Sequence, residues 1–119
     1  MKVMIVDDSN IIRKAIDKYI RKYDVEIVGH ATNGKDALEL FREKNPDLVT
    51  LDITMPEMNG LECMQEMLKI KDDVKVIIVT ALNDKATALE ALSQGAHSFL
   101  GKPFNEEKLD QVLSKVINS

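Results

Sequence analysis

Five residues whose side chains could do chemistry lie at or just beyond the ends of short apolar runs: Asp7, Asp8, Asp52, Thr80 and Lys102. If three carboxylates converge, each pair repels by about 4 kcal/mol at about 4 Å and an effective dielectric constant of about 20. A proton or a hard divalent cation would relieve that repulsion, and Mg²⁺ favours oxygen ligands and often brings phosphate oxygens with it. Lysine ammonium and threonine hydroxyl groups can both bond to phosphate oxygens. The set therefore predicts metal-assisted phosphoryl transfer onto a carboxylate nucleophile, for which Asp52 is the candidate.

These side chains can meet only if the apolar runs are strands of one sheet. Strands are predicted at 3–6, 25–28, 48–52, 74–80 and 98–100, and helices at 11–20, between 34 and 45, at 60–68, 84–94 and 105–118. Continuous apolar strands joined by helices indicate a parallel sheet that is covered on both faces. Right-handed crossovers then give a doubly wound α/β sandwich. In such sheets the site lies beyond the carboxyl ends of the strands, where the five residues fall.

The predicted helices have recognisable end signals. Ser9 or Asp8 can cap the first helix, and Asn105 can cap the last. Pro46 disfavours helical geometry in the residue before it, so the second helix must end there. Gly95 is a suitable C-terminal residue for the helix at 84–94.

Length and composition narrow the classes of protein. A chain of 119 residues with 45% hydrophobic and 30% charged residues has the size and composition of one folded domain. The net charge of −4, without a basic cluster, argues against nucleic acid as a partner. Cys63 is the single cysteine, and the first apolar run is too short for a signal peptide or a membrane span. We therefore expect a monomeric cytoplasmic protein that binds neither nucleic acid nor membranes.

Four short motifs together resemble a known family: Val6-Asp7-Asp8, Leu51-Asp52 followed by Met55-Pro56-Glu57-Met58-Asn59-Gly60, Val79-Thr80-Ala81, and Lys102-Pro103-Phe104. In this order and at these intervals they resemble the receiver domain of bacterial two-component response regulators, most closely the single-domain chemotaxis type, CheY. The resemblance covers essentially the whole chain, so residues 1–119 are expected to form one receiver domain. It implies a flavodoxin-like (βα)5 sandwich with strand order 2-1-3-4-5, a topology for which CheY is itself the standard example.

The resemblance also implies which residues act on the phosphoryl group. Asp52 becomes the phosphate acceptor. The Mg²⁺ ligands become the carboxylates of Asp8 and Asp52 and the backbone carbonyl of Thr54, while Asp7 holds the metal's waters.

Two further residues are implied to contact the phosphoryl group once it is transferred. Lys102 would pair with it, aimed by a cis peptide bond to Pro103, and Thr80 would bond to it. Because phosphorylation adds negative charge and acceptor oxygens, Thr80 and the loop after it would be drawn inward. The ring of Phe99 would then turn inward as well. Chemotaxis members commonly carry tyrosine at this position, so Phe99 lacks a hydroxyl group that a partner could contact.

The resemblance implies particular partners. The phosphoryl donor would be a sensor histidine kinase of the chemotaxis type, CheA-like, and a separate phosphatase is a possible partner. The changed surface, comprising the helix at 84–94, the fifth strand and the helix at 105–118, would bind the flagellar motor switch or another downstream protein. A phosphorelay intermediate or a phosphate sink is the alternative role. Thr54 and Leu82 would flank the attacking water, and the bulky Leu82 is expected to slow self-dephosphorylation.

Other functional classes fit the sequence less well. A phosphatase of the haloacid dehalogenase type needs a second carboxylate two residues after its nucleophile, where this chain has Thr54, and its nucleophile follows the first strand. A flavin or nucleotide carrier needs a glycine-rich loop where this chain has Asp7-Asp8. The protein is therefore expected to be a signalling phosphoacceptor that catalyses only its own phosphorylation and dephosphorylation.

Several residues also have ordinary structural interpretations. The ring of Phe99 could simply belong to the core. Cys63 is expected to be a small, partly buried residue without chemistry, and His30 and His97 match no pattern of metal ligands.

Overall fold

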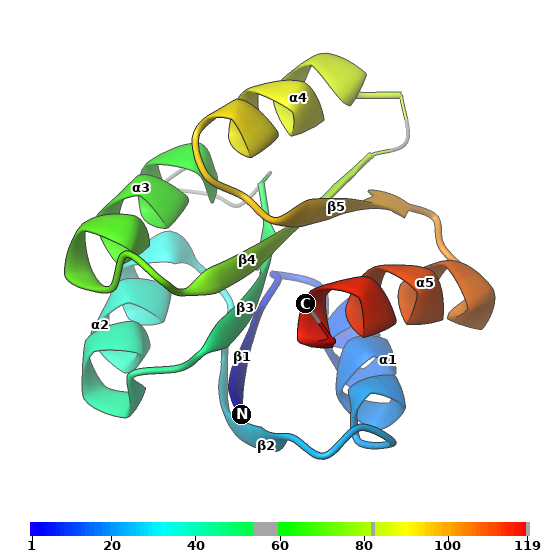
Figure 1. The fold of residues 1–119 in the computed structure, drawn as a ribbon, viewed down its shortest axis with the longest axis horizontal. Helices are drawn as coiled ribbons and strands as arrows, with labels where there is room; N and C mark the ends of the chain where they lie inside the picture. The colour runs from blue at the N-terminus through cyan, green and yellow to red at the C-terminus, as the bar shows by residue number, and fades with distance from the viewer. Residues whose placement is uncertain (54–59, 82, 119) are drawn as a thin grey trace.

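Strands and helices alternate along the part of the chain that the computed structural model describes, residues 1–53, 60–81 and 83–118. The strands are β1 (Lys2–Val6), β2 (Glu26–Ala31), β3 (Leu48–Asp52), β4 (Lys75–Ala81) and β5 (Ser98–Lys102). The helices are α1 (Asn10–Ile20), α2 (Gly34–Lys44), α3 (Gly60–Ile70), α4 (Lys85–Ser93) and α5 (Glu106–Ile117). Every strand pairing is parallel and the order is β2-β1-β3-β4-β5 (Figure 1). The predicted doubly wound fold and the strand order implied by the resemblance are confirmed.

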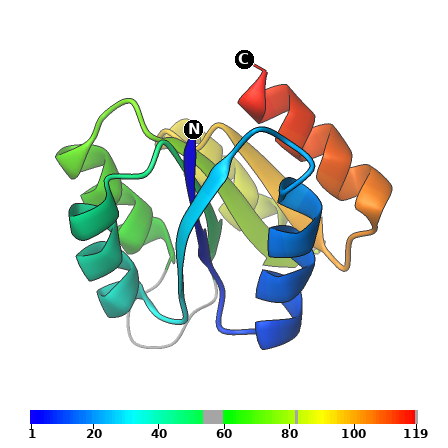
Figure 2. The same ribbon diagram turned by 90° about the horizontal axis from the view of Figure 1, so that it is seen from below.

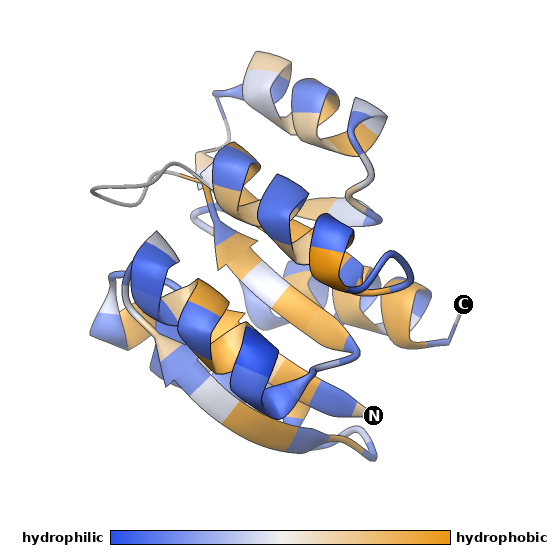
Figure 3. Cartoon of the chain, turned by 90° about the vertical axis from the view of Figure 1, so that its left-hand side faces the viewer, coloured by the Kyte–Doolittle hydropathy of each residue, from blue (hydrophilic) through white to orange (hydrophobic). Residues whose placement is uncertain are grey.

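Two apolar cores lie on opposite faces of the sheet, because consecutive residues of a strand point to opposite faces. In β1, Val3 and Ile5 belong to the core under α1 and α5, whereas Met4 and Val6 belong to the core under α2, α3 and α4. Figure 2 shows α1 and α5 on one side of the sheet and α2 and α3 on the other. Figure 3 shows apolar strands inside helices whose outer faces are polar. Coverage of both faces explains why the inner strands read as continuous apolar runs.

The register of the sheet brings the strand ends to one edge. Val6, the last residue of β1, pairs with Leu51, so Asp7 and Asp52 follow neighbouring positions. Thr80 pairs with Gly101, and the next pair brings Lys102 level with the end of β4. Residues from four strands that are far apart in the sequence are therefore placed at one end of the sheet.

The predicted helix ends are also found. The side chains of Ser9 and Asn105 accept hydrogen bonds from the backbone N–H groups of Ile12 and Lys108, respectively. Helix α2 ends at Lys44, before a left-handed residue, Asn45 with φ of 50°, that directly precedes Pro46. Local sequence therefore sets where these helices begin and end.

Two predictions about local structure were wrong. Strand β2 continues to Ala31, beyond the predicted end at 28, because an edge strand can expose polar residues such as His30 that interrupt the apolar pattern. Cys63 is fully buried rather than partly buried, and its Sγ–H group donates to the carbonyl of Gly34. Burial raises the pKa of the Cys63 thiol to about 12, which keeps it protonated and unreactive. Among the described helices, none combines the length and apolar character that a membrane crossing would require.

Candidate functional site

Three carboxylates gather at the carboxyl edge of the sheet. Asp7 and Asp52 are buried, with 0% and 1% of their surfaces exposed, while Asp8 is exposed. One oxygen from each of the three lies within 4.8 Å of the others. The convergence predicted from the strand ends is therefore observed.

Lys102 lies among these carboxylates. Its Nζ is 3.0 Å from Oδ2 of Asp7 and 3.4 Å from Oδ2 of Asp52. Burial by itself would lower the pKa of Lys102, but the contact with Asp7 and the charge of Asp52 outweigh burial and raise it. The ammonium group is thus kept protonated. The peptide bond from Lys102 to Pro103 is cis, as the resemblance implied.

Asp7 is held by hydrogen bonds through its backbone and through one oxygen of its carboxylate. Its backbone N–H donates to the carbonyl of Ala31 at 3.1 Å, and its Oδ1 accepts from the N–H of Ser9 at 2.8 Å. Its carbonyl accepts from Nη1 of Arg13 at 2.6 Å. Burial raises the pKa of Asp7 above its usual range, although the bonds from Ser9 and Lys102 act in the opposite direction. The buried carboxylate is therefore rigidly placed at some cost in solvation.

Arg13 was not singled out from the sequence. Side chains on a helix lean toward its N-terminus, so a long cationic side chain four residues after the cap Ser9 can reach back to the turn before the helix. The position of Arg13 four residues after the cap was therefore the sequence signal that could have predicted this contact.

Thr80 brings a hydroxyl group to the same edge of the sheet. It is buried, and its Oγ1 has no hydrogen-bond partner among the described residues. An unsatisfied buried hydroxyl costs about 1–3 kcal/mol. Thr50, deeper in β3, also has such an oxygen, but its neighbours across the sheet are Ile5 and Ile77. Of these two hydroxyl groups, that of Thr80 lies at the strand ends, where an incoming oxygen could satisfy it.

The end of β3 requires a glycine at the start of α3. A Cβ atom on Gly60 would lie 2.4 Å from Cα of Ile53 and 2.8 Å from the carbonyl oxygen of Asp52. Both contacts are with backbone, which cannot move aside, and the N–H of Gly60 donates to the carbonyl of Ile53 at 2.9 Å. The close approach of Gly60 therefore helps to fix the backbone that carries Asp52.

The structure does not place every predicted site residue in this cluster. Thr54 and Leu82 fall outside the described residues. Phe99 is 40% exposed on β5, so its interpretation as a plain core residue was wrong. Its ring instead borders a groove between β5 and α5.

The donor set fits a hard divalent cation. Three carboxylates facing one ammonium group leave a formal charge of −2 on the four residues Asp7, Asp8, Asp52 and Lys102. All three donors are oxygens, which is the chemistry that Mg²⁺ prefers. The cluster is thus suited to Mg²⁺ and to a phosphoryl group, for which Lys102 and Thr80 supply donors.

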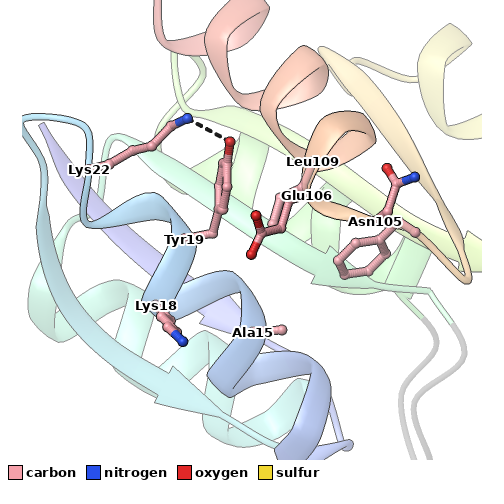
Figure 4. Close-up of a pocket in the computed structure, with 8 residues that line it drawn as sticks. Ala15, Lys18, Tyr19, Lys22, Asn105, Glu106 and Leu109 are labelled. Atoms are coloured by element: carbon pink, nitrogen blue, oxygen red, sulfur yellow. Dashed lines mark hydrogen bonds between the residues drawn. The ribbon is translucent and has the colours of Figure 1, made fainter.

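A separate pocket of about 590 Å³ lies between α1 and the start of α5 (Figure 4). Tyr19 and Lys22 line part of it, and Nζ of Lys22 donates to the hydroxyl oxygen of Tyr19 at 2.6 Å. None of its lining residues belongs to the carboxylate cluster. The cluster at the sheet edge therefore remains the candidate site.

Comparison with known proteins identifies relatives along nearly the whole chain. Residues 3–114 match the family described as response regulator receiver domain. The chemotaxis protein CheY of Thermotoga maritima is 42% identical over 115 residues, covering 97% of this chain and 96% of that protein. CheY of Bacillus subtilis is 35% identical over 117 residues, covering 98% of each chain.

Solved structures agree with these relatives. The receiver domain of AraT from Geobacillus stearothermophilus has a TM-score of 0.91 and 32% identity, covering 98% of this chain and 92% of that one. A complex of CheX, CheY, BeF3 and Mg²⁺ from Borrelia burgdorferi has a TM-score of 0.90 and 31% identity, covering 98% of this chain and 89% of that one. The chain therefore belongs to the response regulator receiver family and is homologous to the single-domain chemotaxis proteins of the CheY type.

Proposed function

We propose that this protein, with residues 1–119 as one receiver domain, is a phosphorylation-activated switch of bacterial chemotaxis that accepts its phosphoryl group on Asp52. The observation that supports this most directly is the placement of Asp52. It is buried at the end of β3, with the ammonium group of Lys102 at 3.4 Å and oxygens of Asp7 and Asp8 within 4.8 Å. A carboxylate so placed has a counter-charge and two further carboxylates beside it, as an acceptor of phosphoryl groups needs.

The transfer uses the side chains of the site. A carboxylate oxygen of Asp52 forms a bond to phosphorus as the bond from phosphorus to the imidazole nitrogen of a kinase phosphohistidine breaks, and that nitrogen keeps the electron pair. Lys102 balances charge on the phosphoryl oxygens, and the hydroxyl of Thr80 donates to one of them. Asp8, Asp52 and the carbonyl of Thr54 would hold Mg²⁺, with Asp7 bonding to its waters. When bound, Mg²⁺ supplies positive charge that offsets the carboxylates and the phosphoryl oxygens.

The switch and its output lie on neighbouring elements. Movement of Thr80 toward the phosphoryl group opens space for the exposed ring of Phe99 to turn inward. Leu89 on α4 is 65% exposed, and Phe99 borders a groove of about 300 Å³ between β5 and α5. An exposed apolar ring that borders a groove supports a protein partner for the α4, β5 and α5 surface.

We propose three partners for this protein, which we expect to be monomeric and cytoplasmic. A CheA-like sensor histidine kinase supplies the phosphoryl group, the flagellar motor switch or another downstream protein reads it, and a phosphatase assists its removal. The B. burgdorferi relative is recorded in a complex with CheX, BeF3 and Mg²⁺, which supports the use of such partners and of Mg²⁺. The protein itself catalyses only its own phosphorylation and dephosphorylation.

Labelling with acetyl phosphate tests the acceptor. Asp52→Asn is expected to abolish Mg²⁺-dependent incorporation of phosphate, measured by intact-mass spectrometry or a phosphate-affinity gel. Asp47→Asn, a matched change at the opposite end of β3, should leave labelling intact. Labelling of Asp52→Asn at the level of the unmodified chain would overturn the assignment of Asp52.

A further inference from the structure

We propose that Arg13 is a positioning residue that fixes the turn carrying Asp7 and Asp8, and so sets the affinity of the site for Mg²⁺. The inference rests on the proposed function, since it assumes that Asp8 is a ligand. It concerns a residue that contacts none of the three carboxylate groups in the described structure, and it would act through the backbone.

The guanidinium group of Arg13 bridges two parts of the β1–α1 connection. Its Nη1 donates to the carbonyl oxygen of Asp7 at 2.6 Å, and its Nη2 donates to Oδ1 of Asn10 at 3.1 Å. The first is a short, charge-assisted hydrogen bond and the side chain is half-buried. A planar fork held at two points loses its freedom to rotate, so Arg13 is a fixed donor.

That bond fixes the peptide group that leads into Asp8. The carbonyl of Asp7 and the N–H of Asp8 belong to one planar unit, so holding the oxygen sets the orientation of the whole plane. The N–Cα bond of Asp8 lies in that plane, so holding the plane fixes the position of the Cα atom from which the Asp8 side chain leaves.

Asp8 depends on this support more than its neighbours do. Asp7 is held directly by Ser9 and Lys102 through its carboxylate. The exposed carboxylate of Asp8 has no hydrogen bond or ion pair with any described residue. Its position therefore depends on the backbone alone, and a metal ligand that is not held in place must be ordered when the metal binds.

The charge of Arg13 is also compatible with a bound cation. Lys102 contacts two carboxylate groups, so its ammonium group would share them with a bound Mg²⁺ ion. Arg13 is directed at a carbonyl oxygen and an amide oxygen, so it supplies positive charge near the turn without occupying a carboxylate. Removing it should weaken the binding of Mg²⁺ and not strengthen it, which separates this role from simple charge competition.

The test is the dissociation constant of Mg²⁺ for metal-free protein, measured by calorimetry or by amide shifts in NMR spectra. Arg13→Ala is expected to bind Mg²⁺ roughly tenfold more weakly, since groups that orient metal ligands commonly contribute this much. Lys14→Ala removes a neighbouring exposed cation of α1 and should change affinity less than about twofold, as a residue without contacts to the ligands would. A merely structural role would lower the melting temperature of Arg13→Ala and leave its Mg²⁺ affinity unchanged, which would overturn the proposal.

Two further variants separate the possible failures. If the unmodified chain binds Mg²⁺ and Asp8→Asn does not, the metal site stands and Arg13→Ala tests the positioning role by itself. If the unmodified chain shows no saturable binding, the metal site and this inference both fall. Should Arg13→Ala not fold, Arg13→Lys decides, because lysine lacks the planar two-nitrogen fork through which Arg13 holds Asp7 and Asn10. We expect it to bind about threefold more weakly, and an unchanged affinity would overturn the proposal.

Discussion

The aspartates at the two ends of β3, Asp47 and Asp52, have opposite electrostatic surroundings. Asp47, just before the strand, accepts a hydrogen bond from the N–H of Lys2 at 2.8 Å and pairs with Nζ of Lys71 at 3.0 Å. These two contacts lower the pKa of Asp47. Its own N–H donates to the carbonyl of Lys2 at 2.8 Å, so the residue ties β1 to the start of β3. Here the carboxylate is matched by donors and stabilises the fold.

At the other end, negative charge is left unbalanced. Asp52 meets Asp7 and Asp8, and Lys102 is the cation in ion-pair contact among the described residues. Burial raises the pKa of Asp7, which means that the folded protein keeps its charge at a cost. Local choices that oppose stability are expected where a binding site requires them. We infer from this contrast that the carboxyl edge of the sheet is suited to binding a ligand, whereas the amino edge stabilises the fold.

The largest change in stability is expected from removing the cation at the carboxyl edge, Lys102. Lys102→Met should lower the free energy of unfolding of metal-free protein by about 3 kcal/mol, because it removes the ammonium group that pairs with two buried carboxylates. In the presence of Mg²⁺ the decrease in the free energy of unfolding should be smaller, since a divalent cation balances the same negative charges. Urea unfolding with EDTA and with Mg²⁺ measures both values, and Lys108→Met on the exposed side of α5 is the control. An equal loss in both conditions would contradict an unbalanced carboxyl edge.

Removing one negative charge should have a smaller effect of the opposite sign. Asp8→Asn should stabilise metal-free protein, because an oxygen of Asp8 lies within 4.8 Å of oxygens of Asp7 and Asp52. Water screens this exposed carboxylate, so the gain should be about 1 kcal/mol, the repulsion of two unit charges about 4 Å apart in water. The same change should abolish the stabilisation that Mg²⁺ gives to the unmodified chain. Thermal unfolding with and without Mg²⁺ checks both effects, and Asp72→Asn, an exposed carboxylate far along the chain in the α3–β4 turn, is the control. A variant that is destabilised without metal would show that Asp8 has a structural role.

Most of the composition of the carboxyl edge could be predicted from the sequence. The apolar runs mark the strands, and the carboxyl ends of parallel strands must meet at one edge of the sheet. Asp7, Asp8, Asp52, Thr80 and Lys102 each lie at or next to such an end, so their proximity could be predicted. The contact of Arg13 with a carbonyl could not, because it depends on how one side chain leans along α1. The length of β2 was missed because an edge strand need not be apolar on its exposed positions. The exposure of Phe99 also depends on which face of β5 is left uncovered.

The smallest expected effect is at the amino edge. Asp47→Asn should lower the free energy of unfolding at pH 7 by no more than about 1 kcal/mol, because its side chain is 45% exposed and its ion pair is screened. The folded pKa of Asp47 lies below its unfolded value, so its stabilising effect is present above about pH 4 and is lost as the pH falls through the folded pKa. Urea unfolding of both chains from about pH 7 toward about pH 3 should therefore show a difference that shrinks. Mg²⁺ affinity at pH 7 should not change, because Asp47 lies at the opposite end of the strand from the carboxylate cluster. A weakened affinity would mean that the two ends are coupled through β3, and the contrast between a structural edge and a ligand-binding edge would then fail.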